Sequence, residues 1–402
     1  MSGTLARWGR RLILLVAAGP LLLIAGCWDR TEVNDLALVT GAAIDQVDDT
    51  QIELTIQIFI PQGTGGGGLS GSQKQTGGSQ ITYTISATGT NIAEAISHMQ
   101  EKMPRKIFWG HSEIFLFGEK AARNGIEDDI DFLMRAPQPR ERAYLYTVEG
   151  EAKRILEVHS ILERTTAEVL REMSKSKVSL SVTLAEFGKM LTGDTNAAAM
   201  PWLRELLPLN QQSTKSSDYT VGTAVFHKDK LAGVLNDTAS RGVLWIRDEI
   251  RDAVITVKPA DVPGNVSLRM VRSSTKLKPV IQDGKWSMTV KIKSEYDALQ
   301  NGTKLDLATD NTAIHDVEEA ANQEIESRVR QALELAQKKW KTDIFDFAGE
   351  FHRKYPQAWK KRKDEWEMLF PQMEVRIESD TKLLRPGSSN IKSDLVKEQT
   401  PS

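Results

Sequence analysis

A long amphipathic stripe near the C-terminus is the feature that most restricts the fold of this 402-residue chain. Its apolar residues recur every three or four positions, at Ile314, Val317, Ala321, Ile325, Val329, Leu333, Ala336 and Trp340. This spacing predicts one long helix with a single apolar face. Segments with strand-like alternation flank the stripe at 288–292 and 375–377. We therefore expect the helix to cover one face of an antiparallel sheet.

Strand and helix patterns alternate through the first half of the chain. Apolar and polar residues alternate almost perfectly over Gln51–Ile60, which is the period of a half-buried strand. Helical patterns follow at Glu119–Asn124 and Ile126–Arg135, between further strand-like segments. Such alternation is typical of a mixed α/β domain. We expect this N-terminal domain to cover residues 27–198.

The next section is rich in strand patterns, at Thr220–Phe226, Leu231–Leu235, Gly242–Ile246 and Ala253–Val257. We expect a strand-rich middle domain over 199–265 and a C-terminal sheet plus long helix domain over 266–387. Residues 388–402 hold few apolar side chains, which predicts a disordered tail. The predicted fold class is α+β, with a mixed α/β N-terminal domain, a strand-rich region, and an antiparallel sheet packed on one long helix.

Charge and cysteine content exclude several classes of protein. Lys plus Arg total 52 and Asp plus Glu total 54, and this balance argues against a nucleic-acid-binding protein. The chain has one cysteine, Cys27, so it forms no intrachain disulfide and no zinc site that needs two or four cysteines.

The position of Cys27 gives it a specific interpretation. Three arginines and no acid precede the apolar run Leu12–Ile24, which is followed by Ala25 and Gly26. This is the pattern of a secretory signal over residues 1–26, and its ending resembles a bacterial lipobox. We therefore expect a diacylglycerol on the Cys27 thiol, with the option of an N-acyl chain, and no other cofactor. Two acyl chains suffice for a stable membrane anchor. The alternative is an ordinary cleaved signal with an accidental cysteine.

Motifs for catalysis or metal binding are weak. Gly63, Gly65 and Gly68 match a dinucleotide-binding pattern, but no helical pattern follows them. The six histidines lack metal-ligand spacing, and no nucleophile-elbow motif is present. His111, beside Ser112 and Glu113, is better interpreted as a strand-end histidine than as part of a catalytic site. We expect no catalytic residues, no metal site and no enzymatic activity.

A basic segment with tryptophans lies between Lys338 and Trp366. It includes the run Lys360, Lys361, Arg362 and Lys363, together with Trp359. Lysine and tryptophan together suit a lipid headgroup interface, and lysines also suit an acidic partner surface. The third interpretation is a solvated face whose tryptophans point into the core. The run Lys360–Lys363 is our candidate for contact with a membrane or a partner.

Several short motifs, in order along the chain, resemble a known family. They are Cys27-Trp28-Asp29-Arg30, Phe108-Trp109-Gly110-His111, Gly222-Thr223-Ala224-Val225-Phe226, Lys341-Thr342-Asp343-Ile344-Phe345 and Tyr355-Pro356 with Trp359. The chain resembles the Ger(x)C spore-germination lipoproteins from about residue 27 to about residue 387.

The resemblance implies a non-enzymatic role. Members of that family are lipid-anchored C-type subunits of nutrient germinant receptors, and their partners are the integral membrane A-type and B-type subunits. It implies a location on the outer face of the cytoplasmic membrane, which is the inner membrane of the spore. It also implies a scaffolding or coupling role. The alternative is a solute-binding lipoprotein of a transporter, which would need two similar lobes around a cleft.

Overall fold

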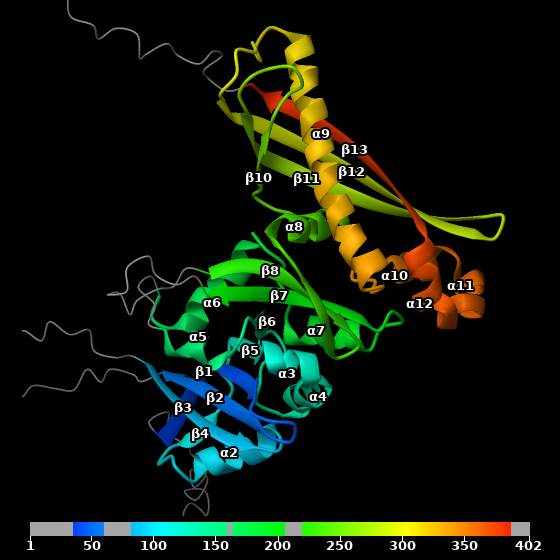
Figure 1. The fold of residues 1–402 in the computed structure, drawn as a ribbon. Coiled ribbons are helices and arrows are strands. Elements are labelled where there is room, and N and C mark those ends of the chain that lie inside the picture. Colours follow the sequence, from blue (N-terminus) through cyan, green and yellow to red (C-terminus); the bar gives the residue numbers. More distant parts are fainter. Residues whose placement is uncertain (1–34, 60–81, 159–162, 206–218, 387–402) are drawn as a thin grey trace, which may run out of the picture.

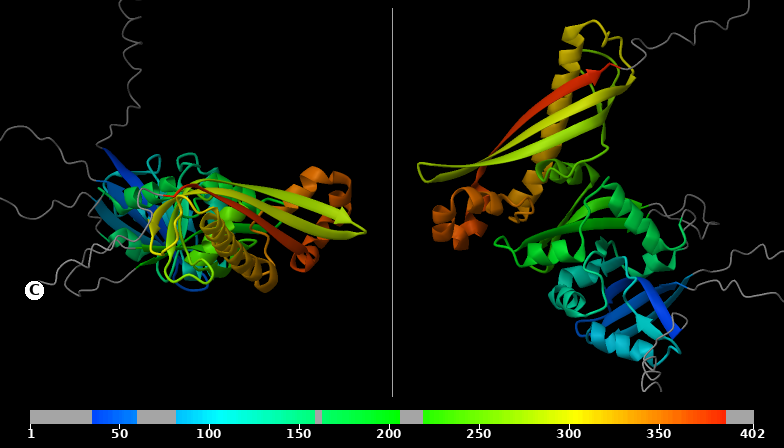
Figure 2. Two further views of the ribbon diagram at one scale, coloured as in Figure 1. Left: turned by 90° about the horizontal axis from the view of Figure 1, so that it is seen from above. Right: turned by 180° about the vertical axis from the view of Figure 1, so that it is seen from behind.

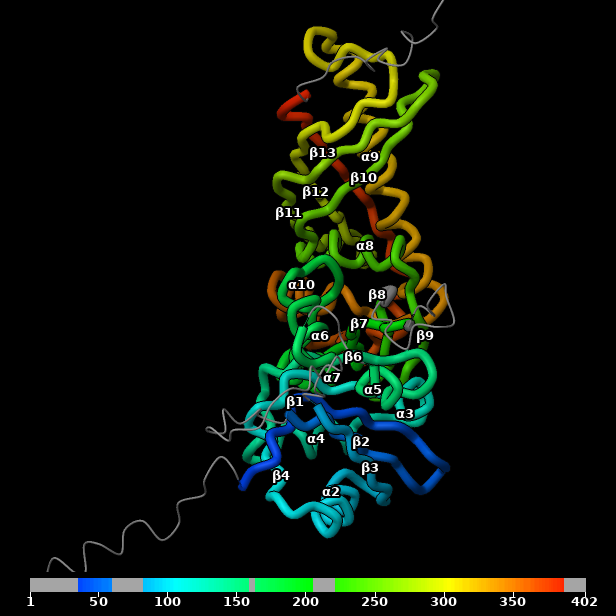
Figure 3. The backbone as a smooth tube through the Cα atoms, turned by 90° about the vertical axis from the view of Figure 1, so that its left-hand side faces the viewer, coloured from blue at the N-terminus to red at the C-terminus, as the bar shows by residue number. Residues whose placement is uncertain are grey.

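The computed structural model describes residues 35–59, 82–158, 163–205 and 219–386. Two β-sheets, one of nine strands and one of four, organise this part of the chain. They lie toward opposite ends of an elongated molecule (Figures 1 and 3). The predicted signal sequence (1–26), the glycines at 63, 65 and 68, and the predicted disordered tail (388–402) lie outside the described residues.

The first sheet is mixed. Its strands are β1 (Leu36–Gln46), β2 (Ile52–Phe59), β3 (Thr82–Gly89), β4 (Lys106–Phe108), β5 (Ile114–Gly118), β6 (Tyr144–Val148), β7 (Ala197–Glu205), β8 (Tyr219–His227) and β9 (Lys230–Leu235). Their order is β3-β2-β1-β5-β6-β7-β8-β9, and β4 pairs with β1. The central strands β1, β5, β6 and β7 are parallel, while both ends of the sheet are antiparallel.

Helices cover both faces of this sheet. They are α2 (Ile92–Gln100), α3 (Glu119–Asn124), α4 (Glu127–Arg135), α5 (Lys153–Glu157), α6 (Thr166–Ser176) and α7 (Leu184–Leu191). Alternate side chains of β5 pack on opposite faces of the sheet. Phe115 and Phe117 belong to one buried cluster, and Leu116 belongs to the other. The mixed α/β domain predicted for the first half is therefore present.

The strands expected in residues 199–265 form no separate sheet in the described residues. β8 pairs with β7 along its whole length and β9 pairs with β8, so all three extend the first sheet. β10 (Val254–Val257) pairs with β11 instead and belongs to the second sheet. The expected middle domain is thus divided between the two sheets, because backbone hydrogen bonds join its strands to their neighbours on either side.

The second sheet contains β10, β11 (Val266–Gln282), β12 (Lys285–Asn301) and β13 (Glu374–Arg385), in that order. The long helix is α9 (Asn311–Leu333), which continues as the π-helical turn η3 (Glu334–Lys339). α9 lies against β10 and β13 on one face of the sheet (Figure 1). The predicted packing of one long helix on a sheet is correct.

The expectation of a purely antiparallel sheet is wrong, because β13 runs parallel to β12. Between these two strands the chain forms α9 and then the helices α10 (Phe347–Lys354), α11 (Pro356–Arg362) and α12 (Trp366–Gln372). A parallel pair needs such a long crossover, whereas a tight hairpin, as between β11 and β12, gives an antiparallel pair.

Helix α8 (Asp237–Ile246) connects the two halves of the molecule. Part of it, Gly242–Ile246, was expected to be a strand, but the Asn236 side chain accepts a 2.9 Å hydrogen bond from the Ala239 N–H and starts a helix. α8 crosses α9 so closely that a Cβ on Gly242 would lie 2.2 Å from the Arg328 carbonyl oxygen. Only glycine fits this crossing.

Gly242→Ala should lower the free energy of unfolding by about 1–3 kcal/mol, because the added methyl group meets backbone that cannot move aside. The matched control is Gly188→Ala in α7, where the added Cβ meets only the flexible, partly exposed end of Met134. The control should leave stability unchanged or raise it slightly, as alanine favours helix. Thermal denaturation measures both, and equal shifts would contradict the proposed close crossing.

Candidate functional site

The candidate lipid-attachment residue, Cys27, lies outside the described residues. Its role therefore stays a prediction from the sequence. The first described strand, β1, begins nine positions later at Leu36.

The basic run lies on the helices that follow α10. Lys360 and Lys361 are exposed near the end of α11, and Lys363 is exposed at the start of a short 3₁₀ turn. Arg362 is bound to Glu365 at 2.6 Å. The structure assigns no ion pair to the three lysines among the described residues, so they present free positive charge to a neighbouring molecule.

The tryptophans of this segment do not face solvent. Trp359 and Trp366 are 2% and 3% exposed, and both pack around Trp286 of β12, with ring centroids 6.4 and 6.3 Å away. They cannot form a lipid headgroup interface together with the lysines. The interpretation in which the tryptophans point into the core is correct for these two.

A buried carboxylate, Asp343, holds the turn before α10. It accepts hydrogen bonds from the backbone N–H groups of Phe345, Phe347 and Ala348 at 3.2, 3.2 and 2.9 Å, and from Trp366 Nε1 at 3.2 Å. Burial raises the pKa of this carboxyl to about 6, although the backbone donors oppose that shift. Asp343 therefore fastens α10 and α12 to the end of α9.

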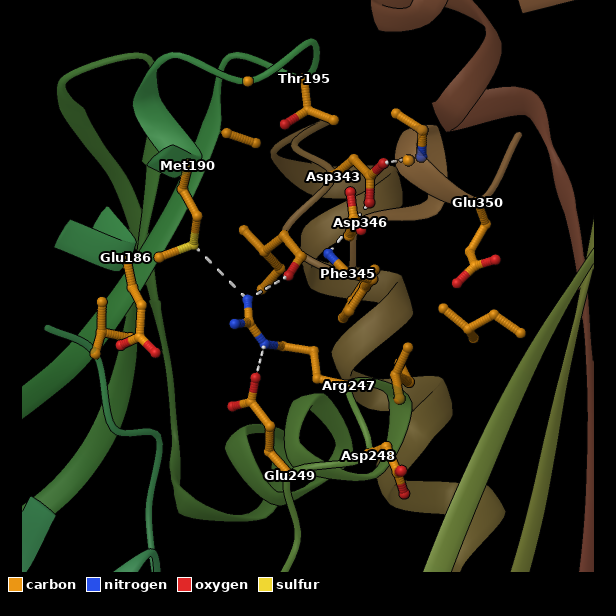
Figure 4. A pocket seen from close by; sticks show the side chains of 18 of the residues that line it. Glu186, Met190, Thr195, Arg247, Asp248, Glu249, Asp343, Phe345, Asp346 and Glu350 are labelled. Atoms are coloured by element: carbon orange, nitrogen blue, oxygen red, sulfur yellow. Dashed lines mark hydrogen bonds and ion pairs between the residues drawn. The ribbon is translucent and has the colours of Figure 1, made fainter. Parts of the chain in front are cut away.

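A pocket of about 690 Å³ lies where the two halves of the molecule meet. It is lined by the α7 region, by the end of α8 and by the residues that lead into α10 (Figure 4). Arg247 lies at its centre, with Nε donating to Glu249 at 2.8 Å and Nη1 to the Ile344 carbonyl at 3.1 Å. The Thr275 hydroxyl beside it is buried without a hydrogen-bond partner.

The acidic side chains of this pocket are already occupied by structural contacts. Asp194 accepts from Trp359 Nε1 at 3.2 Å and lies 3.3 Å from His352 Nδ1, Asp248 accepts from the Thr275 N–H at 2.8 Å, and Asp346 and Glu350 bind Arg353. Asp194 belongs to the first half of the chain and its two partners to α10 and α11. The residues that line the pocket therefore hold the two halves together, and we call this region the joint. Their chemistry does not indicate one class of ligand.

The other candidates from the sequence form no catalytic arrangement. The Ser112 hydroxyl donates to the Trp109 carbonyl at 2.8 Å, and Glu113 is bound to Arg171, so neither is oriented for a reaction with His111. Within the described residues, His, Cys, Asp and Glu side chains nowhere gather in a group of three that could hold a metal ion. In the same part of the chain, no helix has the length and hydropathy required to cross a bilayer.

Sequence reasoning missed the joint. Its parts come from four separate segments of the chain, within 177–197, 246–251, 275–277 and 343–353. The only signal was indirect: the motif Lys341–Phe345, which carried part of the family resemblance, contains Asp343.

Comparison with known proteins matches each half of the chain to a family of protein domains. The sequence model "Spore germination protein N-terminal domain" matches residues 29–205, and "Spore germination B3/GerAC like, C-terminal" matches residues 221–387. YfkR of Bacillus subtilis (strain 168) is 30% identical, with 89% of this chain and 91% of YfkR aligned. The chain belongs to this family of spore germination proteins.

Two further comparisons agree with the family. Spore germination protein KC of Bacillus subtilis (strain 168) is 26% identical, with 92% of this chain and 94% of the relative aligned. The crystal structure of the GerBC protein superposes with a TM-score of 0.53 at 19% identity, and covers 86% of this chain and 97% of that chain. The GerBC comparison shows that the two share a fold.

Asp343→Asn should remove one source of pH dependence from stability. The unfolded carboxyl loses its proton near pH 3.8 and the folded one near 6, so ionisation of Asp343 destabilises the folded chain as the pH rises between these values. From pH 4 to pH 7, wild type should lose about 2 kcal/mol relative to the variant.

Urea unfolding at the two pH values measures this difference. Asp364→Asn, which removes an exposed carboxyl in the turn after α11, is measured beside it at both pH values as the matched substitution. A constant difference between wild type and Asp343→Asn would contradict the prediction.

Proposed function

We propose that this chain is the lipid-anchored C-type subunit of a spore germinant receptor. The observation that carries the proposal is the match of both halves of the chain, over nearly their whole length, to spore germination proteins. In this role Cys27 carries a diacylglycerol, and the folded body lies beside integral A-type and B-type membrane subunits. Tethering raises the effective concentration of the body at its partners. It acts as a scaffold or as a coupling element.

The alternative, a solute-binding lipoprotein of a transporter, lacks support. Such a protein needs two similar lobes around a cleft, whereas the two sheets here differ in strand number and topology. The pocket at the joint is bounded by contacts that hold its walls together, which does not favour opening and closing around a solute.

Purification from spores tests the proposed role directly. The full chain, carrying a C-terminal affinity tag, should recover two integral membrane proteins after mild detergent extraction, identified by mass spectrometry. Recovery of transporter components, or of no membrane protein, would overturn the proposal.

Cys27→Ala should abolish incorporation of a labelled fatty acid and leave the signal sequence uncleaved, because the thiol is the acceptor for the diacylglycerol. In-gel detection of an alkyne-tagged palmitate measures the first effect, and intact mass measures the second. Cys27→Ser is a second variant, in which the side chain keeps nearly the same size but lacks the thiol. Labelling that persists in both variants would show that the anchor lies elsewhere.

Reversing the free charges of the basic run should weaken association with the receptor. In Lys360→Glu/Lys361→Glu/Lys363→Glu, recovery of the membrane subunits should fall about tenfold, the loss expected for about 1.4 kcal/mol of electrostatic attraction. A matched control reverses Lys102, Arg105 and Lys106, which are exposed near β4 in the first half. Unchanged recovery with the first variant would exclude Lys360–Lys363 as a contact.

A further inference from the structure

The second sheet has one open face. Alternate residues of β12 and β13, among them Val290, Ile292 and Ile377, are buried on the side of α9. The opposite side, here called the outer face, carries register rows such as Lys278–Thr289–Arg376 and Lys276–Lys291–Glu378. Viewed from behind, the strands lie in front of α9 and no helix covers them (Figure 2).

Basic side chains on the outer face exceed the available acids. Three of them are paired: Arg272 with Glu295 at 2.5 Å, Lys291 with Glu378 at 3.3 Å, and Lys293 with Asp380 at 3.8 Å. Lys276, Lys278, Arg376 and Lys382 are exposed and have no ion pair among the described residues.

The arrangement of these charges costs stability. Lys276 lies directly opposite Lys291, and like charges at such positions destabilise a sheet. Free cations in adjacent rows therefore indicate a surface that is completed by negative charge from another molecule.

Apolar side chains lie at the irregular end of the same sheet. The register skips one residue at each of three bulges, and the skipped residues are Val271, Leu299 and Leu384. These side chains are 50%, 57% and 48% exposed. A bulge redirects a side chain away from the regular alternation, so these three escape burial under α9. Three exposed apolar side chains, one on each of β11, β12 and β13, therefore lie toward the irregular end of the sheet.

The outer face is large enough for a specific interface. The strands β10, β11, β12 and β13 hold 4, 17, 17 and 12 residues. With about 3.3 Å along the strand and about 4.8 Å across it for each residue, the face covers roughly 790 Å², close to the ~800 Å² that each partner contributes to a standard protein interface.

We infer that the outer face of the second sheet is a docking surface for an acidic surface of a protein partner. The inference rests on the proposed function, in which that partner is a membrane subunit of the receptor. A protein fits better than a lipid surface, because the acids Glu295, Glu378 and Asp380 lie among the cations of this face, and a partner with fixed charges can pair with the free cations while avoiding these acids. The skipped apolar residues include no tryptophan or tyrosine, the side chains that typically anchor a protein at headgroups.

Charge reversal tests the surface. In Lys276→Glu/Lys278→Glu/Arg376→Glu, recovery of membrane subunits from spores should fall at least tenfold, while the control reversed at Lys102, Arg105 and Lys106 should stay within twofold of wild type. The corresponding glutamine variant retains no charge at these positions and should show an intermediate loss. Because all three residues are exposed and the Lys276–Lys291 repulsion is relieved, melting temperatures should equal or slightly exceed that of wild type. The glutamine variant serves if the glutamate variant unfolds.

The outcomes separate the two proposals. If wild type recovers no membrane subunit, the proposed function fails and the docking surface fails with it. If wild type recovers the subunits and both variants at 276, 278 and 376 recover them equally well, the docking surface alone is overturned.

Cross-linking distinguishes a protein from a lipid as the occupant. Ser274→Cys places a thiol on the outer face, and Asn124→Cys places one at the exposed end of α3. After attachment of a photoreactive maleimide in spore membranes, Ser274→Cys should give an adduct with a receptor subunit and Asn124→Cys should not. Adducts with lipid alone at residue 274, or equal protein adducts at both positions, would overturn the inference.

Discussion

The crossing of α8 and α9 is the contact on which the arrangement of the molecule depends. α8 follows β9, the last strand of the first sheet, and α9 covers the second sheet. Their backbones meet at Gly242, and Arg328 of α9 also lies over the Trp245 ring at 5.9 Å. The relative position of the two sheets is therefore set by two helices in van der Waals contact, with no space for a longer side chain.

Around this crossing, polar contacts join the same two halves. Arg247, at the end of α8, binds the carbonyl before α10, and Asp194 of the α7–β7 loop binds α10 and α11. Trp340 lies against the Gly233 backbone of β9. Because these contacts come from several elements on each side, the joint resists rotation more than a single linker would. Several contacts of this kind are consistent with the scaffolding or coupling role proposed above.

The sequence predicted those elements whose pattern is periodic and long. α9 was predicted because a stripe of eight apolar residues has no other simple explanation, and the strands of the first half were predicted because their alternation is regular. The prediction of a strand at Gly242–Ile246 was wrong because every residue of this segment is buried. An apolar run without periodicity does not distinguish a helix from a strand. The cap at Asn236 was the missed signal. The direction of β13 depends on the whole crossover and is not encoded in the strand itself.

Prediction of the site was limited for a different reason. Exposure of Lys360, Lys361 and Lys363 could be expected from their charge, but burial of Trp359 depends on Trp286, more than 70 residues away. The outer face could not be found from composition, since its free cations are visible only once the register fixes which acids pair with which bases.

The parallel return of β13 has a consequence for how the molecule reaches its surroundings. β12 and β13 both run away from the first sheet, so the described chain ends at the tip opposite the end where β1 begins (Figure 1). A body attached through residue 27 would then have its lipid anchor toward one end and its second sheet toward the other. The outer face of the second sheet would therefore meet structures well away from the point of attachment.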